Sequence, residues 1–447
     1  MKHSTKKDEA FWKTQERRRE KRLGQPCCTQ SGISWSMIEL KGRFAVVVHG
    51  EKDCLNCFHH HRGESSVQFY STRLTDAQLT MGDTEEVLEQ CLSLIVEEEK
   101  PELILVLGTC PVEVVGARFY ETVDVVSSKT DIPIIALRTS GLKLSSQQEM
   151  LDWLYSTLAS LDSEPRELSG LPEERRKLDL LWKRYFSIRP REFPLLEEKE
   201  INIIGLSENR FPELKWILNY LGFQVQIFPE KASLDDWRQI KHATHSFMLD
   251  IEMFPKLKRV LEEWKQRILP IPPPFGLSST VIALQRICEE HSRQKELGVF
   301  LDDILPLLRE ERQKMRAYCT GKSMALVIRM RNSNRIQAIA LQGLGLYWMF
   351  EELGYDIHIL IQGATDAAVQ DAYAQNIKDY GIQAKCTVFS SPFELRKTLQ
   401  TENFELICIA DQGIEAARGT KAKIVQPEQF QIGLWGAFEN WKLLRRV

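Results

Sequence analysis

The chain has 447 residues, of which 43% are hydrophobic and 27% are charged. This composition is typical of globular proteins, and the length favours roughly two to four domains. The formal net charge of −3 gives no electrostatic reason to expect nucleic acid as a partner. The sequence has no apolar run of about 18 residues and no apolar stretch after its basic start. We therefore expect no membrane span, no secretory signal and a cytoplasmic location.

Residues 1–24 form a charged N-terminal arm that is rich in both signs between Lys6 and Arg22. We expect a solvated helix or a loose arm, with an arm that binds nucleic acid or a partner as the alternative. After it, apolar strand-like runs alternate with amphipathic stretches, which is typical of α/β domains with mostly parallel sheets. A first domain is expected over residues 25–160, with buried strands in "RFAVVVHG", "ELILVLGTC" and "IPIIALRTSG".

The remaining chain repeats this pattern. Residues 161–199 are charged, contain prolines and are expected to form a helical connector. A second domain, over 200–320, opens with a strand, a loop, a helix that Gly222 ends, and another strand. A third domain, over 321–447, ends in a helix, and its "EELGYDIHIL" echoes "NYLGFQVQIF" of the second. We therefore predict three Rossmann-like α/β domains. The glycines of "GLGL" are expected inside a helix and not between a strand and a helix, so we do not interpret them as a nucleotide-binding fingerprint.

The cysteines crowd towards the N-terminal quarter of the chain. Five of the ten precede residue 100, and Cys110 follows soon after. Disulfides are not expected in a cytosolic chain of this size. Cys54 follows the predicted strand from Phe44 to Val48, and Cys110 follows the predicted strand from Leu103 to Leu107. The carboxyl ends of parallel strands share one edge of a sheet, so these thiols can meet there and suit a soft metal or an Fe–S cluster. The four later cysteines are expected to be small buried hydrophobic residues: Cys288, Cys319, Cys386 and Cys408.

The stretch "CLNCFHHH" offers a second interpretation of the same region. A C-x-x-C with nearby histidines has the spacing of zinc ligands, but no second ligand pair follows at finger spacing. His59, His60 and His61 are expected in a polar helix start or loop, or else one of them donates protons or lines a substrate cavity. His242 and His245 are expected at the surface and at helix ends. No Walker A sequence is present, so we do not expect this chain to hydrolyse ATP.

Three short motifs occur in a fixed order: C-x-x-x-G, then HG-x-x-x-C, then TC-x-x-x-x-G. The matching residues are Cys28 with Gly32, His49 and Gly50 with Cys54, and Thr109 and Cys110 with Gly116. Later stretches such as "INIIGLSEN", "PIPPPFGLSST" and "GLWGAFENWKLL" continue the pattern to the C-terminus. With these landmarks the sequence resembles the nitrogenase component 1 superfamily. That group includes nitrogenase subunits, their cofactor-assembly scaffolds, and the light-independent protochlorophyllide and chlorophyllide reductases.

The resemblance implies a site and partners. Cys28, Cys54 and Cys110 would be ligands of an iron–sulfur cluster, [4Fe–4S] or larger, shared at the interface with a homologous subunit in an α2β2 tetramer. Cys27 is an alternative to Cys28. A separate ATP-hydrolysing iron protein would deliver electrons, so ATP would be used by that partner. Arg62 and His61 are candidate catalytic residues, since the resemblance implies an arginine beside the substrate-reducing cofactor.

The sequence also departs from the family's catalytic subunit. The cofactor-binding cysteine of that subunit would fall near Asp250 and its histidine near Ile432, and neither ligand is present. The resemblance therefore implies a partner-type subunit, or a subunit of a reductase with an organic substrate. Two alternatives remain: a scaffold that assembles a nitrogenase-type cofactor, and a non-catalytic α/β binding protein whose cysteines are merely buried.

Overall fold

The structure is a computed structural model of the whole chain. It describes residues 37, 40–54, 67–139, 147–161, 180, 183, 199–206, 212–229, 232–249, 251, 254–329, 344–363, 375, 377–378, 381–410 and 413–446. The arm of residues 1–24 and nearly all of the connector 161–199 lie outside these residues. Within the described ranges, every helix is too short or too polar to cross a membrane.

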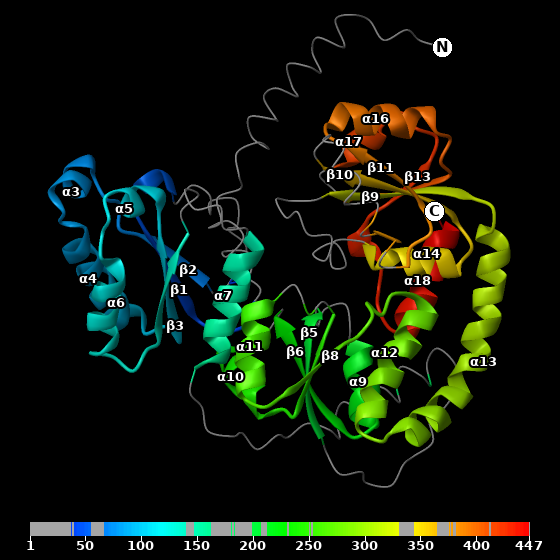
Figure 1. Ribbon diagram of the computed structural model, residues 1–447, viewed down its shortest axis with the longest axis horizontal. Coiled ribbons are helices and arrows are strands. Elements are labelled where there is room, and N and C mark those ends of the chain that lie inside the picture. The colour runs from blue at the N-terminus through cyan, green and yellow to red at the C-terminus, as the bar shows by residue number, and fades with distance from the viewer. Residues whose placement is uncertain are drawn as a thin grey trace, which may run out of the picture. The chain divides into compact units, whose positions relative to one another are not determined.

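The chain forms two compact units (Figure 1). The first contains residues 1–166, 228–242 and 254–266, and the second contains 167–227, 243–253 and 267–447. The first unit holds one sheet and the second holds two, and the strand pairs with a described register run parallel. The predicted α/β class with three mostly parallel sheets is confirmed. The expected domain ranges 25–160, 200–320 and 321–447 stay a prediction, and each contains one of the three sheets.

The sheet of the first unit has the order β2-β1-β3-β4. Its strands are β1 (Phe44–His49), β2 (Val67–Ser71), β3 (Leu103–Gly108) and β4 (Ile134–Arg138). Every residue of β1 and β3 is buried, as expected for central parallel strands that are covered on both faces. Because His49 pairs with Gly108 in the register, the two central strands end at the same level.

The helices of the first unit come from distant parts of the chain. They are α3 (Asp76–Met81), α4 (Thr84–Leu94), η2 (Ile95–Glu99), α5 (Cys110–Val114), α6 (Phe119–Ser127), α7 (Gln147–Ala159), α10 (Leu234–Gln239), η4 (Ile240–His242) and α11 (Pro255–Glu263). One face of the sheet packs its apolar side chains against α4 and α6. The carboxylate of Asp152, on α7, accepts the backbone N–H groups of Lys256 and Leu257 at 2.8 and 2.9 Å, and so caps α11.

The second unit holds sheets of order β6-β5-β7-β8 and β11-β10-β9-β12-β13. Their strands are β5 (Lys199–Leu206), β6 (Phe223–Pro229), β7 (His245–Met248), β8 (Arg267–Pro270), β9 (Ser323–Arg329), β10 (Asp356–Gln362), β11 (Lys385–Phe389), β12 (Leu406–Cys408) and β13 (Lys423–Val425). The helices are α9 (Pro212–Tyr220), α12 (Gly276–Glu290), α13 (Gln294–Cys319), α14 (Leu346–Glu352), α16 (Pro392–Thr401), α17 (Ile414–Ala417) and α18 (Leu434–Arg446), with the turn η8 (Pro427–Gln429). One large apolar core joins both sheets.

The repeated glycine pattern has the predicted structure. Gly222 (φ 85°) lies between α9 and β6, and Gly354 (φ 79°) lies between α14 and β10. Only glycine adopts this left-handed conformation at little cost. The prediction for "GLGL" is wrong in one respect, because α14 begins at Leu346 with Gly345 as its N-cap. The motif still lacks the third glycine of a fingerprint, since Trp348 stands there.

Candidate iron–sulfur site

Two of the predicted cysteines follow the two central strands of the first sheet. After β1, residues 52–54 make a short 3-10 turn in which the Cys54 N–H donates to the Glu51 carbonyl at 3.2 Å. After β3, Thr109 is the N-cap of α5 and Cys110 is the first residue of that helix. Both cysteines are partly exposed. The fold thus brings Cys54 and Cys110 to the same carboxyl edge of one sheet, where α/β proteins bind ligands.

Close backbone packing joins the two strand ends. A Cβ atom on Gly50 would lie 2.0 Å from Thr109 Oγ1, and one on Gly108 would lie 2.6 Å from Phe119 Cζ. The Thr109 N–H also donates to the His49 carbonyl at 3.1 Å. The glycines of the "HG" and "LGTC" motifs are therefore required by packing, because a side chain on Gly50 would push the two strand ends apart and one on Gly108 would clash with Phe119 of α6.

Thr72, which follows β2, connects the end of β2 to the end of β1 by hydrogen bonds. Its hydroxyl oxygen accepts the Gly50 N–H at 3.0 Å and lies 3.2 Å from Nδ1 of His49. The Leu74 N–H donates to the Gly50 carbonyl at 2.9 Å. Thr72 was not predicted as a site residue, and the only sequence signal for it is the β-branched and aromatic run "VQFYS" just before it.

Two polar side chains at this edge are fully buried. His49 and Thr109 are both 0% exposed. Burial lowers the pKa of His49 to about 4, although the Glu85 carboxylate acts in the opposite direction, so the ring is neutral at pH 7. Among the described residues, neither Nε2 of His49 nor Oγ1 of Thr109 has a hydrogen-bond partner. Cysteine thiolates beside buried donors are a suitable donor set for a sulfur-rich anionic group such as an Fe–S cluster.

Several predicted site residues lie outside the described residues. They are Cys27, Cys28, Cys57, His59, His60, His61 and Arg62. The described part of the chain brings together no group of three or more metal-ligating side chains. The candidate ligand set in the described residues is therefore the pair Cys54 and Cys110.

The other histidine and cysteine predictions are confirmed only in part. His242 ends η4 as predicted, but His245 is the first residue of β7, where its ring contacts that of His291 with centroids 4.3 Å apart. Cys288, Cys319 and Cys408 are buried as predicted.

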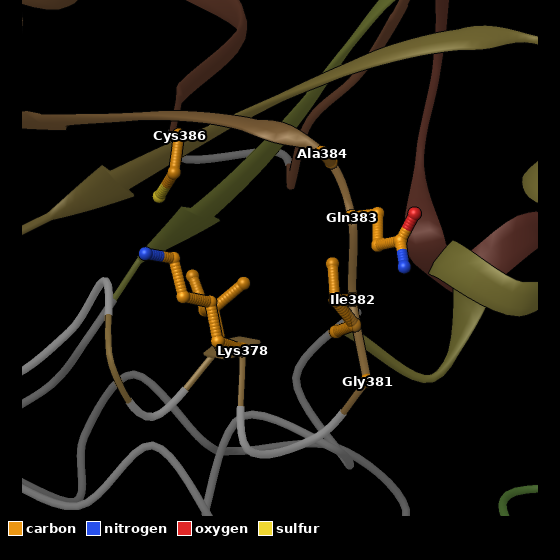
Figure 2. Close-up of a pocket in the computed structure, with 7 residues that line it drawn as sticks. Lys378, Gly381, Ile382, Gln383, Ala384 and Cys386 are labelled. Carbon is orange, nitrogen blue, oxygen red and sulfur yellow. The ribbon is translucent and has the colours of Figure 1, made fainter.

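Cys386 differs from that prediction because it is partly exposed. It lines a cavity of about 540 Å³, where its thiol and the Lys378 amine point into the same space (Figure 2). Burial raises the pKa of the Cys386 thiol to about 11, so it is not a thiolate at neutral pH.

The first unit therefore places Cys54 and Cys110 at the carboxyl edge of one parallel sheet, in a chain that has three such sheets. The family model "Nitrogenase component 1 type Oxidoreductase" matches residues 28–427. The chain belongs to the nitrogenase component 1 type oxidoreductase family, as predicted from the sequence.

Named relatives include the light-independent protochlorophyllide reductase subunit N of Heliobacterium mobile, which is 22% identical over 273 residues. The match covers 59% of this chain and 59% of that protein. The subunit N of Cyanophora paradoxa is 23% identical over 314 residues, or 63% of this chain and 64% of that protein. The chain thus spans less than two thirds of the length of these relatives.

Solved structures confirm the fold. "Nitrogenase Cp1 at pH 6.5" has a TM-score of 0.69 at 14% identity, over 94% of this chain and 91% of that one. "Nitrogenase Cp1 at pH 5" has a TM-score of 0.65 at 13% identity, over 93% and 87%. The predicted nitrogenase component 1 fold is correct.

Proposed function

We propose that this chain is the Fe–S cluster-bearing subunit of a nitrogenase-like reductase complex. It receives electrons from an ATP-hydrolysing iron protein and passes them to a cofactor or substrate held mainly by a homologous partner subunit in an α2β2 tetramer. The observation that supports this best is the pair Cys54 and Cys110 at the carboxyl ends of adjacent buried strands. Family membership and the subunit N relatives support the reductase class.

In this proposal Cys28, Cys54 and Cys110 hold the cluster, which supplies one-electron transfer when bound. The chain's own residues contribute by holding the carboxyl edge of the first sheet in a fixed position. The Gly50–Thr109 contact and the Thr72 hydrogen bonds hold the ends of β1, β2 and β3 at one level. His61 and Arg62 follow the second ligand closely, and we propose that they bind the substrate and supply protons to it.

Two exposed apolar side chains lie on helices that follow this edge. Met81, at the end of α3, is 77% exposed, and Val114, at the end of α5, is 71% exposed. Both helices follow carboxyl ends of strands in the first sheet, and they lie at one end of the unit (Figure 1). We propose that Met81 and Val114 take part in docking the redox partner, since exposed apolar residues that are covered by a partner form interaction sites.

The test is the iron and acid-labile sulfide content of the anaerobic complex, with EPR spectra of the dithionite-reduced protein. The chain is co-expressed with its partner subunit and compared with Cys54→Ala and Cys110→Ala. Cys91→Ala is the matched control, because Cys91 lies on α4 and packs against the apolar core of the same unit. We expect iron and sulfide in similar amounts in the wild type and the control, and their loss in the two edge variants. Stoichiometric zinc, or no metal in any protein, would overturn the proposal.

A further inference from the structure

The edge that carries Cys54 and Cys110 also carries two buried hydrogen-bond donors. The first donor is His49. The Thr72 hydroxyl oxygen lies 3.2 Å from Nδ1 of the His49 ring and 3.4 Å from the Gly50 carbonyl oxygen. The 3.2 Å contact exists in either tautomer of the neutral ring, and we assign the tautomer in which the Thr72 hydroxyl donates to Nδ1 and the ring proton is on Nε2. That N–H has no acceptor among the described residues.

The Thr109 hydroxyl is the second donor. A threonine at an N-cap normally accepts a backbone N–H from the first turn of its helix. Thr109 makes no such bond with α5, although its side chain is completely buried. Its hydroxyl has no partner among the described residues.

These two donors belong to one packed unit. The Thr109 N–H donates to the His49 carbonyl, and Thr109 Oγ1 packs against the Cα atom of Gly50. A buried donor without an acceptor destabilises the folded state, and apolar side chains of similar shape would avoid that cost. The preceding residues of β1 are all apolar. A polar residue on each of two neighbouring strand ends therefore indicates an acceptor that arrives at this edge.

We propose that the His49 Nε2–H and the Thr109 hydroxyl donate hydrogen bonds to the sulfur atoms of the cluster or of its cysteine ligands, and so set its reduction potential. This inference rests on the proposed function. Donors that face sulfur stabilise the additional negative charge of the reduced cluster, which raises its reduction potential. The chain then fixes the potential by two side chains that are not themselves ligands.

The experiment is an EPR-monitored redox titration of the anaerobic complex with two matched pairs of variants. Thr109→Val removes the hydroxyl at nearly constant shape, and Thr109→Ser keeps it. His49→Leu removes the donor, and His49→Gln keeps an N–H near the position of Nε2. Thr122→Val is the control, because Thr122 is a buried threonine on α6. At a fixed applied potential we expect Thr109→Val and His49→Leu to lower the ratio of reduced to oxidised cluster about tenfold, which corresponds to ~59 mV for one electron. The other three variants should stay close to wild type.

Each outcome is decisive. A wild-type complex without iron and sulfide would refute the proposed function itself. A wild-type cluster whose potential is the same in Thr109→Val and His49→Leu would refute only the hydrogen-bond inference. If a variant loses its cluster, electron–nuclear double resonance of the wild type in D₂O decides the question. The inference is supported if exchangeable protons couple to the wild-type cluster and fewer of them couple in the variant that still binds a cluster. The absence of such protons from the wild type refutes the inference.

Discussion

A buried carboxyl group in the second unit gives a quantitative prediction about pH. Glu213, on α9, is only 4% exposed. Its Oε2 atom accepts the Trp435 N–H at 2.7 Å, and the carboxyl group also accepts the Gly436 N–H, so it caps α18. A Cβ atom on Gly433 would lie 2.7 Å from Oε2, and Oε1 has no hydrogen-bond partner among the described residues.

Burial raises the pKa of Glu213 from 4.5 to about 8, with the two backbone hydrogen bonds acting in the opposite direction. Between pH 4.5 and 8 the folded chain therefore keeps a proton that the unfolded chain has released. Unfolding releases this proton, so the free energy of unfolding falls as pH rises, by about 1.4 kcal/mol per pH unit. The loss between pH 5 and 7.5 is about 3 kcal/mol, and it ends above the folded pKa.

The perturbation is Glu213→Gln, which keeps an acceptor for the two N–H groups and cannot ionise. Urea unfolding of wild type and variant, followed by tryptophan fluorescence between pH 5 and 8.5, measures the difference in unfolding free energy. We expect this difference to move in favour of the variant by about 3 kcal/mol as pH rises. Glu289→Gln is the control, because Glu289 is exposed on α12. A difference that stays constant with pH would show that Glu213 is ionised throughout, and would refute the argument.

Four further predictions concern the edge and its surroundings. Gly50→Ala places a methyl group 2.0 Å from Thr109 Oγ1, and overpacking of this kind costs about 1–3 kcal/mol, so both the melting temperature and the bound iron should fall. Gly298→Ala, which meets nothing within 4 Å, should lower neither. Asp152→Ala leaves two backbone N–H groups at the start of α11 without their acceptor and should cost about 1–3 kcal/mol in urea unfolding, whereas an unchanged midpoint would contradict the cap. Met81→Asp should raise the concentration of iron protein needed for half-maximal turnover several-fold without changing the potential of the cluster, and an unchanged requirement would exclude Met81 from the docking surface. Finally, an iron chelator should remove iron from Gly50→Ala faster than from wild type, as followed by the absorbance of the chelate, and equal rates would argue against a role of the edge in retaining the cluster.

The central strands and their edge were predictable from the sequence. β1 and β3 are unbroken apolar runs that end at or beside a glycine, and such runs form buried parallel strands. The rule that parallel strands share a carboxyl edge then predicted that Cys54 and Cys110 lie together at that edge. Four strands were not predicted: β2, β7, β8 and β11. These strands are short and contain polar residues, so no unbroken apolar run marks them, and their pairing with neighbours supplies most of their stability.

The details of the site depend on contacts between distant segments, which no local pattern encodes. Thr72 reaches Gly50 across 22 residues of sequence. Glu213 reaches the start of α18 across 222 residues, and Asp152 reaches α11 across 104. In each case the sequence shows only an ordinary polar residue. The hydrogen-bond partner of each residue is known only from the packed structure, because packing decides which donors and acceptors are buried and must be paired.

For the proposed cluster, the close packing of the edge fits electron transfer better than cluster assembly. A cluster that carries electrons must stay bound while its charge changes, whereas a scaffold must release what it builds. The ends of β1 and β3 are joined through Gly50 and Thr109 with no space for even one additional methyl group, and Thr72 fastens β2 to them. Close packing of this kind resists deformation, so opening the edge to release a cluster would break several contacts at once. The chelator comparison between wild type and Gly50→Ala tests this reasoning, since only a retained cluster depends on the packing that the methyl group disrupts.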